Sequence, residues 1–217
     1  MTEFPGLPEF LKLPMAVAGY RARIAMQRPH QELTFQSVLV AREKYKQSQA
    51  SFKEKIDWLI PRVGMDESVR EMIYTNAALR ALYEDLGATL ILLAAASIER
   101  LYRSVGVSLF DRGACSYVGS ISFVRAVQGL ANQYKHWGEW THGGPRNEED
   151  VRVIAELVDN PFRTDAASEF LSRSGFEKYE QFEDALLSCS DGIAHPSLLP
   201  DGRQGIPTVT LRLLPPE

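Results

Sequence analysis

The chain has 217 residues, of which 45% are apolar and 24% are charged, and its formal net charge is −4. This balance is that of a globular protein and excludes a disordered or fibrous chain. A chain of this length buries roughly 70% of the surface that it exposes when unfolded, so it needs neither disulfides nor a structural metal for a stable core. Its two cysteines, Cys115 and Cys189, are too few for a disulfide framework and are typical of a reducing compartment. We therefore expect a cytoplasmic protein.

No segment of the sequence is predicted to enter a membrane. The first eight residues lack the basic region and the apolar run of a secretory signal. The longest apolar run, residues 86–98, spans about 20 Å as a helix, which is shorter than the roughly 30 Å core of a bilayer. We expect this run to form a buried helix of a protein that makes no membrane contact.

The charges are distributed unevenly along the chain. Residues 1–138 carry 17 basic against 13 acidic side chains, whereas residues 139–217 carry 7 against 15. One interpretation is that the molecule has a mildly basic and an acidic surface, and that the acidic C-terminal part contacts a partner protein. The other is that the unevenness is a chance property of solvated faces.

Long helices are predicted for the first half of the chain. Four prolines interrupt residues 1–30, so we expect an N-terminal arm with at most one short helix. Neither glycine nor proline occurs from residue 31 to 60, and apolar residues recur there at three- and four-residue steps, which predicts one long helix. A second long helix is predicted over 66–105, with Asp66 as its cap and Gly87 as a candidate break.

The rest of the chain is predicted to contain shorter elements. Residues 106–117 are expected to form a loop, and a helix follows over 118–140. Three further helices are predicted over 148–158, 165–172 and 179–189, and alternating apolar and polar residues over 206–213 predict one short strand.

These elements predict an all-α fold: a helical bundle with two long helices, short C-terminal helices and one short C-terminal strand. We expect one compact unit that consists of the arm (1–30), a helical core (31–142) and an acidic C-terminal extension (143–217) packed on that core.

The helix predicted over 118–140 has two distinct faces on a helical wheel. Its apolar face is expected to pack on the 86–98 helix and consists of Phe123, Val127, Leu130, Tyr134 and Trp137. The opposite face, named here the polar stripe, consists of Arg125, Gln128, Asn132, His136 and Glu139, with Gly129 at its edge.

Asn132 and His136 are four residues apart, so their side chains are predicted to lie on adjacent turns of one face, about 5–6 Å apart at Cβ. A histidine exchanges protons near neutral pH, and an asparagine amide donates to a phosphate oxygen. Such a pair suits RNA cleavage without a metal, in which a 2′-hydroxyl attacks the neighbouring phosphate. The alternative is a solvated helix face that happens to contain His136.

Two segments carry a resemblance to a known family. Residues 129–137, with the sequence GLANQYKHW, follow residues 90–101, LILLAAASIERL, by some thirty positions. This order looks like the core of HEPN domains, the small α-helical domains of bacterial toxins, abortive-infection proteins and CRISPR-associated ribonucleases. Glu99, Asn132 and His136 match the family's catalytic positions. The resemblance implies an RNA-directed or defence-related protein, a homodimer, and a metal-independent endoribonuclease.

One departure from the family favours a different function. The family's catalytic arginine lies five to seven residues before the histidine, where this chain has Gly129, Leu130 and Ala131. Arg125 lies eleven residues before His136, about 16 Å along a helix axis. The resemblance implies that HEPN-like domains without this arginine are non-catalytic modules for dimerisation or ligand binding. The alternative function is therefore a helical dimerisation module that binds a nucleotide or a partner protein.

Further candidates surround the proposed catalytic set. Glu99 is expected to pair either with Arg103, one turn later, or with His136. Four residues are predicted to bind RNA or another ligand: Arg125, Gln128, Lys135 and Trp140. The spacing of the histidines and cysteines predicts no metal site, and no cofactor is expected. Gly129 leaves room for another backbone, so we expect the polar stripes of two chains to face a shared cleft.

Overall fold

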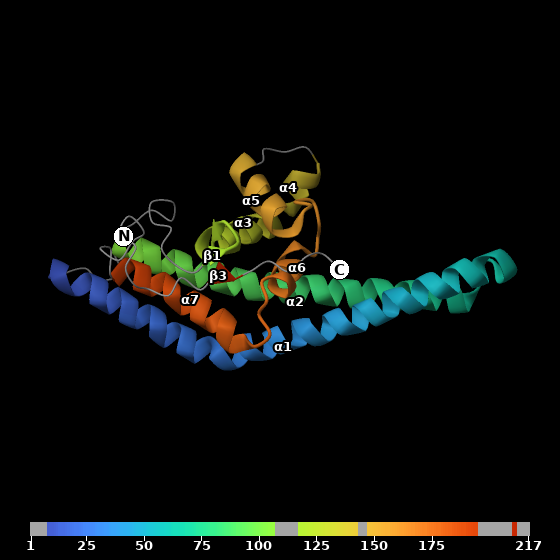
Figure 1. Cartoon of the computed structure of the whole chain (residues 1–217), viewed down its shortest axis with the longest axis horizontal. Coiled ribbons are helices and arrows are strands. Elements are labelled where there is room, and N and C mark those ends of the chain that lie inside the picture. Colours follow the sequence, from blue (N-terminus) through green and yellow to red (C-terminus); the bar gives the residue numbers. More distant parts are fainter. Residues whose placement is uncertain (1–7, 107–116, 143–146, 195–209, 212–217) are drawn as a thin grey trace.

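The computed structural model describes residues 8–106, 117–142, 147–194 and 210–211, and helices make up most of these ranges (Figure 1). The predicted all-α bundle is thereby confirmed. The helices are α1 (Glu9–Val63), α2 (Glu67–Val105), α3 (Phe123–Lys135), α4 (Trp137–Thr141), α5 (Glu148–Val158), α6 (Ala166–Arg173) and α7 (Tyr179–Ala194).

Two long antiparallel helices, α1 and α2, form the base of the molecule, and their joined end extends beyond the other helices (Figure 1). The predicted cap at the start of α2 is present, because the Asp66 carboxylate accepts a hydrogen bond of 2.9 Å from the Val69 amide. At the other end, Gly106 has φ +67° and closes the helix in the left-handed conformation. Local chemistry therefore sets the limits of α2.

The prediction of an N-terminal arm with one short helix is wrong, because α1 begins at Glu9 and runs through Pro14, Pro29 and Pro61. A proline inside a helix removes one backbone hydrogen bond and bends the helix. Figure 1 shows such a bend partway along α1, and Pro29 is the proline nearest the middle. Buried Ile24 and Phe35 hold the helix against its neighbours on both sides of that proline, so tertiary packing outweighs the local penalty.

Gly87 does not break α2, and its role lies in packing. A Cβ atom at this position would lie 2.8 Å from Cα of Ser168 in α6. The Ser168 hydroxyl donates a 2.5 Å hydrogen bond to the Tyr83 carbonyl, one turn before the glycine. The absence of a side chain therefore lets α6 cross α2 at close range.

The helix predicted over 118–140 is shorter than expected. Two-residue strands come first, β1 (Tyr117–Val118) and β2 (Ile121–Ser122), joined by a turn in which Gly119 has φ +63°. β1 also pairs in parallel with β3 (Thr210–Leu211), so the predicted C-terminal strand is confirmed at its described residues. A break at His136, with φ −110° and ψ 18°, then separates α3 from α4.

The core lies where α1 and the second half of α2 meet α3, α5, α6 and α7. From the predicted apolar face, Phe123, Val127 and Leu130 are buried, whereas Tyr134 is 43% exposed because its ring lies beyond this contact. α2 is long and apolar enough to cross a bilayer by length and composition alone, yet half of its most apolar window is buried inside the protein.

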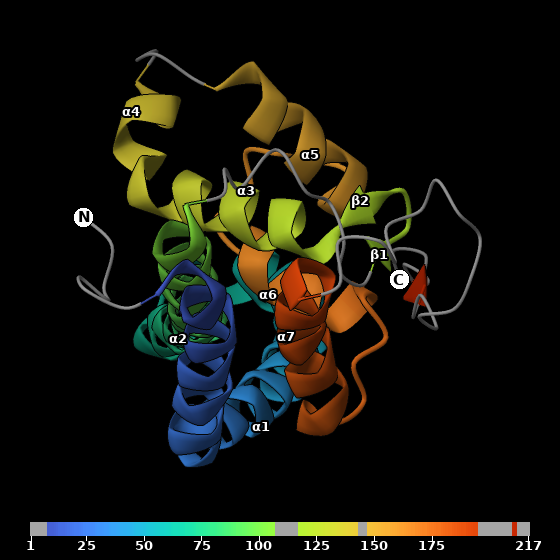
Figure 2. The same cartoon turned by 90° about the vertical axis from the view of Figure 1, so that its left-hand side faces the viewer.

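The acidic part of the chain packs on this frame. Figure 2 shows α5 above α3 and α7 beside α1, while α6 lies on α2. Edge-to-face contacts among phenylalanine rings join α3 to α7 and to the segment before it, with Phe123 and Phe182 centroids 5.7 Å apart and Phe176 and Phe182 centroids 5.6 Å apart. These contacts hold α7 against α3.

Candidate functional site

The polar stripe of α3 lies under α5 of the same chain. The Asn132 amide donates a 3.0 Å hydrogen bond to the carboxylate of Asp150, and Arg125 forms an ion pair with Glu149. On the other side, the Gln128 amide donates to the Ala95 carbonyl of α2 at 3.3 Å. The stripe therefore acts as a contact between helices.

A small hollow of about 260 Å³ lies at this contact. It brings together most of the predicted site residues, and its polar lining is Glu99, Arg125, Gln128, Asn132, Lys135 and Asp150. Asp150 is 2% exposed and was not predicted. The only sequence signal for it was its place in the acidic run 148–150, which is also what the first turn of any helix favours.

The three predicted catalytic residues do not converge. His136 does not line this hollow, and its Nδ1 lies 3.1 Å from the Glu139 carboxylate on the surface. Glu99 pairs with Arg103, the first of the two partners expected for it. Asn132 points to α5 instead.

Two other residues predicted to take part in binding, Trp140 and Gly129, are buried inside the protein. Trp140 is 2% exposed, so its ring has no open face on which a base could stack. Gly129 is buried under α5, where a Cβ atom would lie 3.4 Å from Val153. The side chains of α5 in the same chain fill the space beside this glycine, so the predicted shared cleft between two polar stripes does not fit this arrangement.

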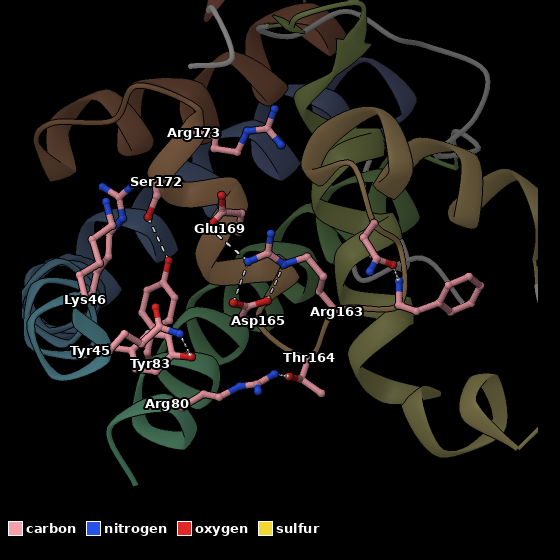
Figure 3. A pocket seen from close by; sticks show the side chains of 14 residues that line it. Tyr45, Lys46, Arg80, Tyr83, Arg163, Thr164, Asp165, Glu169, Ser172 and Arg173 are labelled. Atoms are coloured by element: carbon pink, nitrogen blue, oxygen red, sulfur yellow. Dashed lines mark hydrogen bonds and ion pairs between the residues drawn. The ribbon is translucent and has the colours of Figure 1, made fainter. Parts of the chain in front are cut away.

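A larger hollow of about 530 Å³ lies between α1, α2, α6 and the segment 160–165. It is named here the basic cleft, because five cationic side chains line it against two carboxylates. The cations are Arg42, Lys46, Arg80, Arg163 and Arg173, and the carboxylates are Asp165 and Glu169. In Figure 3, Lys46 rises from α1 on one side, Arg163 lies on the other, and Tyr83 lies between them.

Ion pairs hold several of these cations in fixed positions. Arg163 donates to both oxygens of Asp165, at 2.7 and 2.9 Å, and this hydrogen bonding raises the pKa of the guanidinium. Arg80 donates to Glu84 at 2.7 Å. It also donates to the Thr164 hydroxyl at 3.1 Å, a contact that Figure 3 marks with a dashed line. Since the positions of these two guanidinium groups are already fixed, the groups would lose little conformational freedom on binding an anion.

A strained residue directly precedes the part of the chain that lines the cleft. Asp159 ends α5 with φ +66°, a backbone angle that residues other than glycine rarely adopt. Its carboxylate accepts a 2.8 Å hydrogen bond from Arg173, which lines the cleft. Next to it, the Asn160 side chain accepts a hydrogen bond from the Phe162 amide at 2.9 Å. Strain of this kind is common where a loop is shaped for a ligand.

Aromatic rings form the apolar part of the cleft. Tyr45 and Tyr83 stack with centroids 6.2 Å apart, and the Tyr83 hydroxyl lies 3.1 Å from that of Ser172. Burial raises the pKa of Tyr83 to about 12, so the hydroxyl stays protonated and able to donate at neutral pH. Phe162, at the edge, is 43% exposed.

Only a faint indication of this cleft is present in the sequence. Arg42, Tyr45, Lys46 and Gln49 recur at helical spacing on one face of α1. The groups opposite them come from α2 and from residues 160–173, which lie more than a hundred positions away in the acidic part of the chain. Within the ranges that the structure covers, no three His, Cys, Asp or Glu side chains form a group suited to a metal ion.

Comparisons with protein-family models, with curated proteins and with solved structures give no match for this chain.

Proposed function

We propose that this protein is a non-catalytic helical binding module of the HEPN-like type, and that it holds a phosphate-bearing ligand of the nucleotide class in the basic cleft. The observation that carries the proposal is the convergence of five cations from three helices and one loop on a single hollow. A cytoplasmic location and an RNA-directed or defence-related role belong to the same proposal.

The chemistry of the cleft supports a nucleotide. Its lining carries three more positive than negative side chains, and arginine forks match the geometry of phosphate oxygens. Its volume of about 530 Å³ is within the usual range for sites that bind small molecules, roughly 300–1,000 Å³. The stacked rings of Tyr45 and Tyr83 give the cleft an apolar part beside its cations.

The polar stripe supports binding over cleavage. A proton-transfer residue must reach the reacting atoms, within about 3 Å or through one water molecule. Asn132 is bonded to a buried carboxylate, and His136 is paired with Glu139 outside that hollow. The endoribonuclease function therefore has no assembled site among these residues.

Calorimetric titration with ATP, pyrophosphate and a 5′-phosphorylated RNA oligonucleotide tests the proposal. Replacing Lys46 and Arg80 together by glutamine should weaken ATP binding by at least 10-fold, because two of five positive charges are lost. Lys44 and Arg70 lie on the same helices but do not line the cleft, so their double glutamine variant is the matched control. Equal affinities for both variants, or no binding of any probe by the original chain, would overturn the proposal.

The homodimer is a further part of the proposal, and the outer face of α1 favours it. Ten positions between residues 11 and 40 fall within about 100° of the helix circumference, and none of them is charged. The largest exposed side chains on this face are Leu11, Met15, Met26, Leu33 and Val40, with exposures from 37% to 80%. An uncovered apolar line of this length is unusual for a monomer.

The spacing of this line suits a second copy of the chain. The positions follow steps of four and three residues, as in helices that pair along a seam. A two-fold axis at Ala22 brings Leu11 opposite Leu33 of the second copy. The same axis brings Ala18 opposite Met26, so a small side chain meets a large one.

Light scattering at micromolar to 0.2 mM concentration tests this arrangement against the monomer mass of 24.4 kDa. We expect a mass that rises towards twice this value with concentration, and a constant monomer mass when Met26 and Leu33 are both replaced by glutamate. Met65→Glu, at a position 53% exposed elsewhere, is the control and should dimerise normally. A concentration-independent monomer, or a dimer unaffected by the double variant, contradicts the α1 interface.

A further inference from the structure

A third hollow lies on the other side of segment 160–165 from the basic cleft. It has a volume of about 390 Å³ and lies between α2, α3, α4 and α6. Two rings, Tyr134 and Trp137, line it together with two carboxylates, Glu84 and Asp85. It is named here the aromatic pocket.

The break at His136 creates the aromatic part of this pocket. Tyr134 is in the last turn of α3 and Trp137 is the first residue of α4, so the two rings reach the same hollow from adjacent helices. The Tyr134 ring is 43% exposed, and its hydroxyl lies 3.4 Å from the Asp85 carboxylate. Leu130 and Ala167 provide an apolar floor.

The charges around the aromatic pocket are mainly negative. Glu84 accepts hydrogen bonds from Arg80 and Thr164, so its charge is matched by one cation. Arg163, which also borders the pocket, is matched by two acidic partners. The ionised groups that line the pocket are Glu84 and Asp85 against Arg163. This lining carries a net charge of −1, which disfavours an anion in this pocket.

We propose that the aromatic pocket binds an organic ammonium ion with methylated nitrogen, held between the rings of Tyr134 and Trp137 with Asp85 as its counter-ion. The electron-rich faces of tryptophan and tyrosine attract cations, most strongly when the cation is weakly hydrated. This inference stands apart from the nucleotide proposal, since the side chains that would hold the cation, Tyr134, Trp137 and Asp85, do not line the basic cleft.

The pocket suits a methylated nitrogen better than a primary ammonium group. A primary ammonium ion is strongly hydrated and has three donors to satisfy. Glu84 already accepts from two protein groups, so Asp85 is the carboxylate with the fewest competing contacts. A methylated nitrogen needs no acceptor and matches the apolar floor. The volume exceeds that of a trimethylammonium group, so the natural ligand carries a further substituent.

Titration with three probes tests the class of ligand, followed by calorimetry and by tryptophan fluorescence. The probes are choline, its uncharged analogue of nearly equal size 3,3-dimethyl-1-butanol, and ethanolamine as the smaller primary amine. We expect choline to bind at least 10-fold more tightly than the other two. Equal binding of the uncharged analogue, tighter binding of ethanolamine, or no binding of any probe overturns the proposal.

Variants locate the site. Tyr134→Phe keeps the ring and should change choline affinity less than 2-fold, whereas Tyr134→Leu removes the ring and should lower it at least 5-fold. Because Tyr134 is exposed, both variants should fold. Asp85→Asn should lower the affinity as well, and Trp58→Leu at the exposed end of α1 is the control. Unchanged affinity in both Tyr134→Leu and Asp85→Asn contradicts the assignment.

Discussion

The polar stripe and the basic cleft are both rich in polar side chains, yet they differ in what faces them. In the stripe, Asn132 and Arg125 meet carboxylates from α5, and the remaining hollow is about 260 Å³. In the cleft, cations from α1, α2 and α6 surround about 530 Å³, with three more positive than negative side chains.

A polar helix face can therefore belong to a packing contact as well as to a binding site. The pattern on one helix predicts where polar groups lie, but another helix can cover them and use them for packing. A site that takes its groups from several segments leaves a weaker signal on each of them. Substitutions can separate the structural role of the stripe from the binding role of the cleft.

The largest effect is expected at Gly87, which sets the distance between α2 and α6 beside the cleft. In Gly87→Ala the new Cβ would overlap the Ser168 side chain and lie 2.8 Å from its Cα. Because backbone must move, we expect a loss of about 3 kcal/mol of unfolding free energy, measured by urea denaturation. The cleft should lose ligand affinity as well, since Ser172 follows on α6.

Gly19→Ala is the matched control for this prediction. No atom lies within 4 Å of a Cβ at that position, and the residue is inside α1. We expect a gain of roughly 0.5–1 kcal/mol, because alanine favours a helix over glycine. Similar stabilities for the two variants would show that the close approach of α6 is unimportant.

The second prediction concerns the buried hydroxyl of the cleft. Burial raises the pKa of Tyr83 from 10.0 in the unfolded chain to about 12 in the fold. The unfolded chain therefore loses this proton first, and stability that is complete below pH 10 falls as the pH rises to 12. The expected loss is about 2–3 kcal/mol.

Urea denaturation of the original chain and of Tyr83→Phe between pH 8 and pH 11.5 measures this loss of unfolding free energy. Other tyrosines titrate in both proteins, so their contribution cancels in the difference. The phenylalanine variant should start about 1 kcal/mol lower, because it lacks the hydrogen bond to Ser172, and should fall less steeply. Parallel curves would mean that Tyr83 ionises as freely as in the unfolded chain.

The third prediction assigns the stripe to stability. Asn132→Leu removes the donor to Asp150, a carboxylate that is 2% exposed. We expect a loss of about 1–3 kcal/mol of unfolding free energy, with ATP affinity changed less than 2-fold. Replacing both Asn132 and Asp150 by leucine should recover part of the loss, because no buried polar group is then left unpaired. This role is contradicted if the double variant loses more unfolding free energy than the two single variants lose together.

The sequence predicted elements more accurately than their contacts. The limits of α5 and the cap at Asp66 follow from local signals, and both agree with the structure. The path of α1 through Pro29 and the continuity of α2 at Gly87 depend on neighbours that a single segment does not reveal. For the same reason, the stripe was found but not α5 above it, and the cleft combines residues from 42 to 173.

The smallest effect is expected at His136, the residue on which the endoribonuclease function depends. Its side chain is half exposed and pairs with Glu139 on the surface, an arrangement that contributes little to stability. His136→Ala should change the unfolding free energy by less than about 0.5 kcal/mol.

Purified original and variant chains, incubated with total RNA in EDTA, should leave the same pattern of intact RNA. Cleavage that persists in EDTA, disappears in His136→Ala and also disappears in Asn132→Ala would restore the nuclease function. Such a result would mean that α5 moves off the stripe when RNA binds, because the side chains of Asn132 and His136 do not meet in the present arrangement.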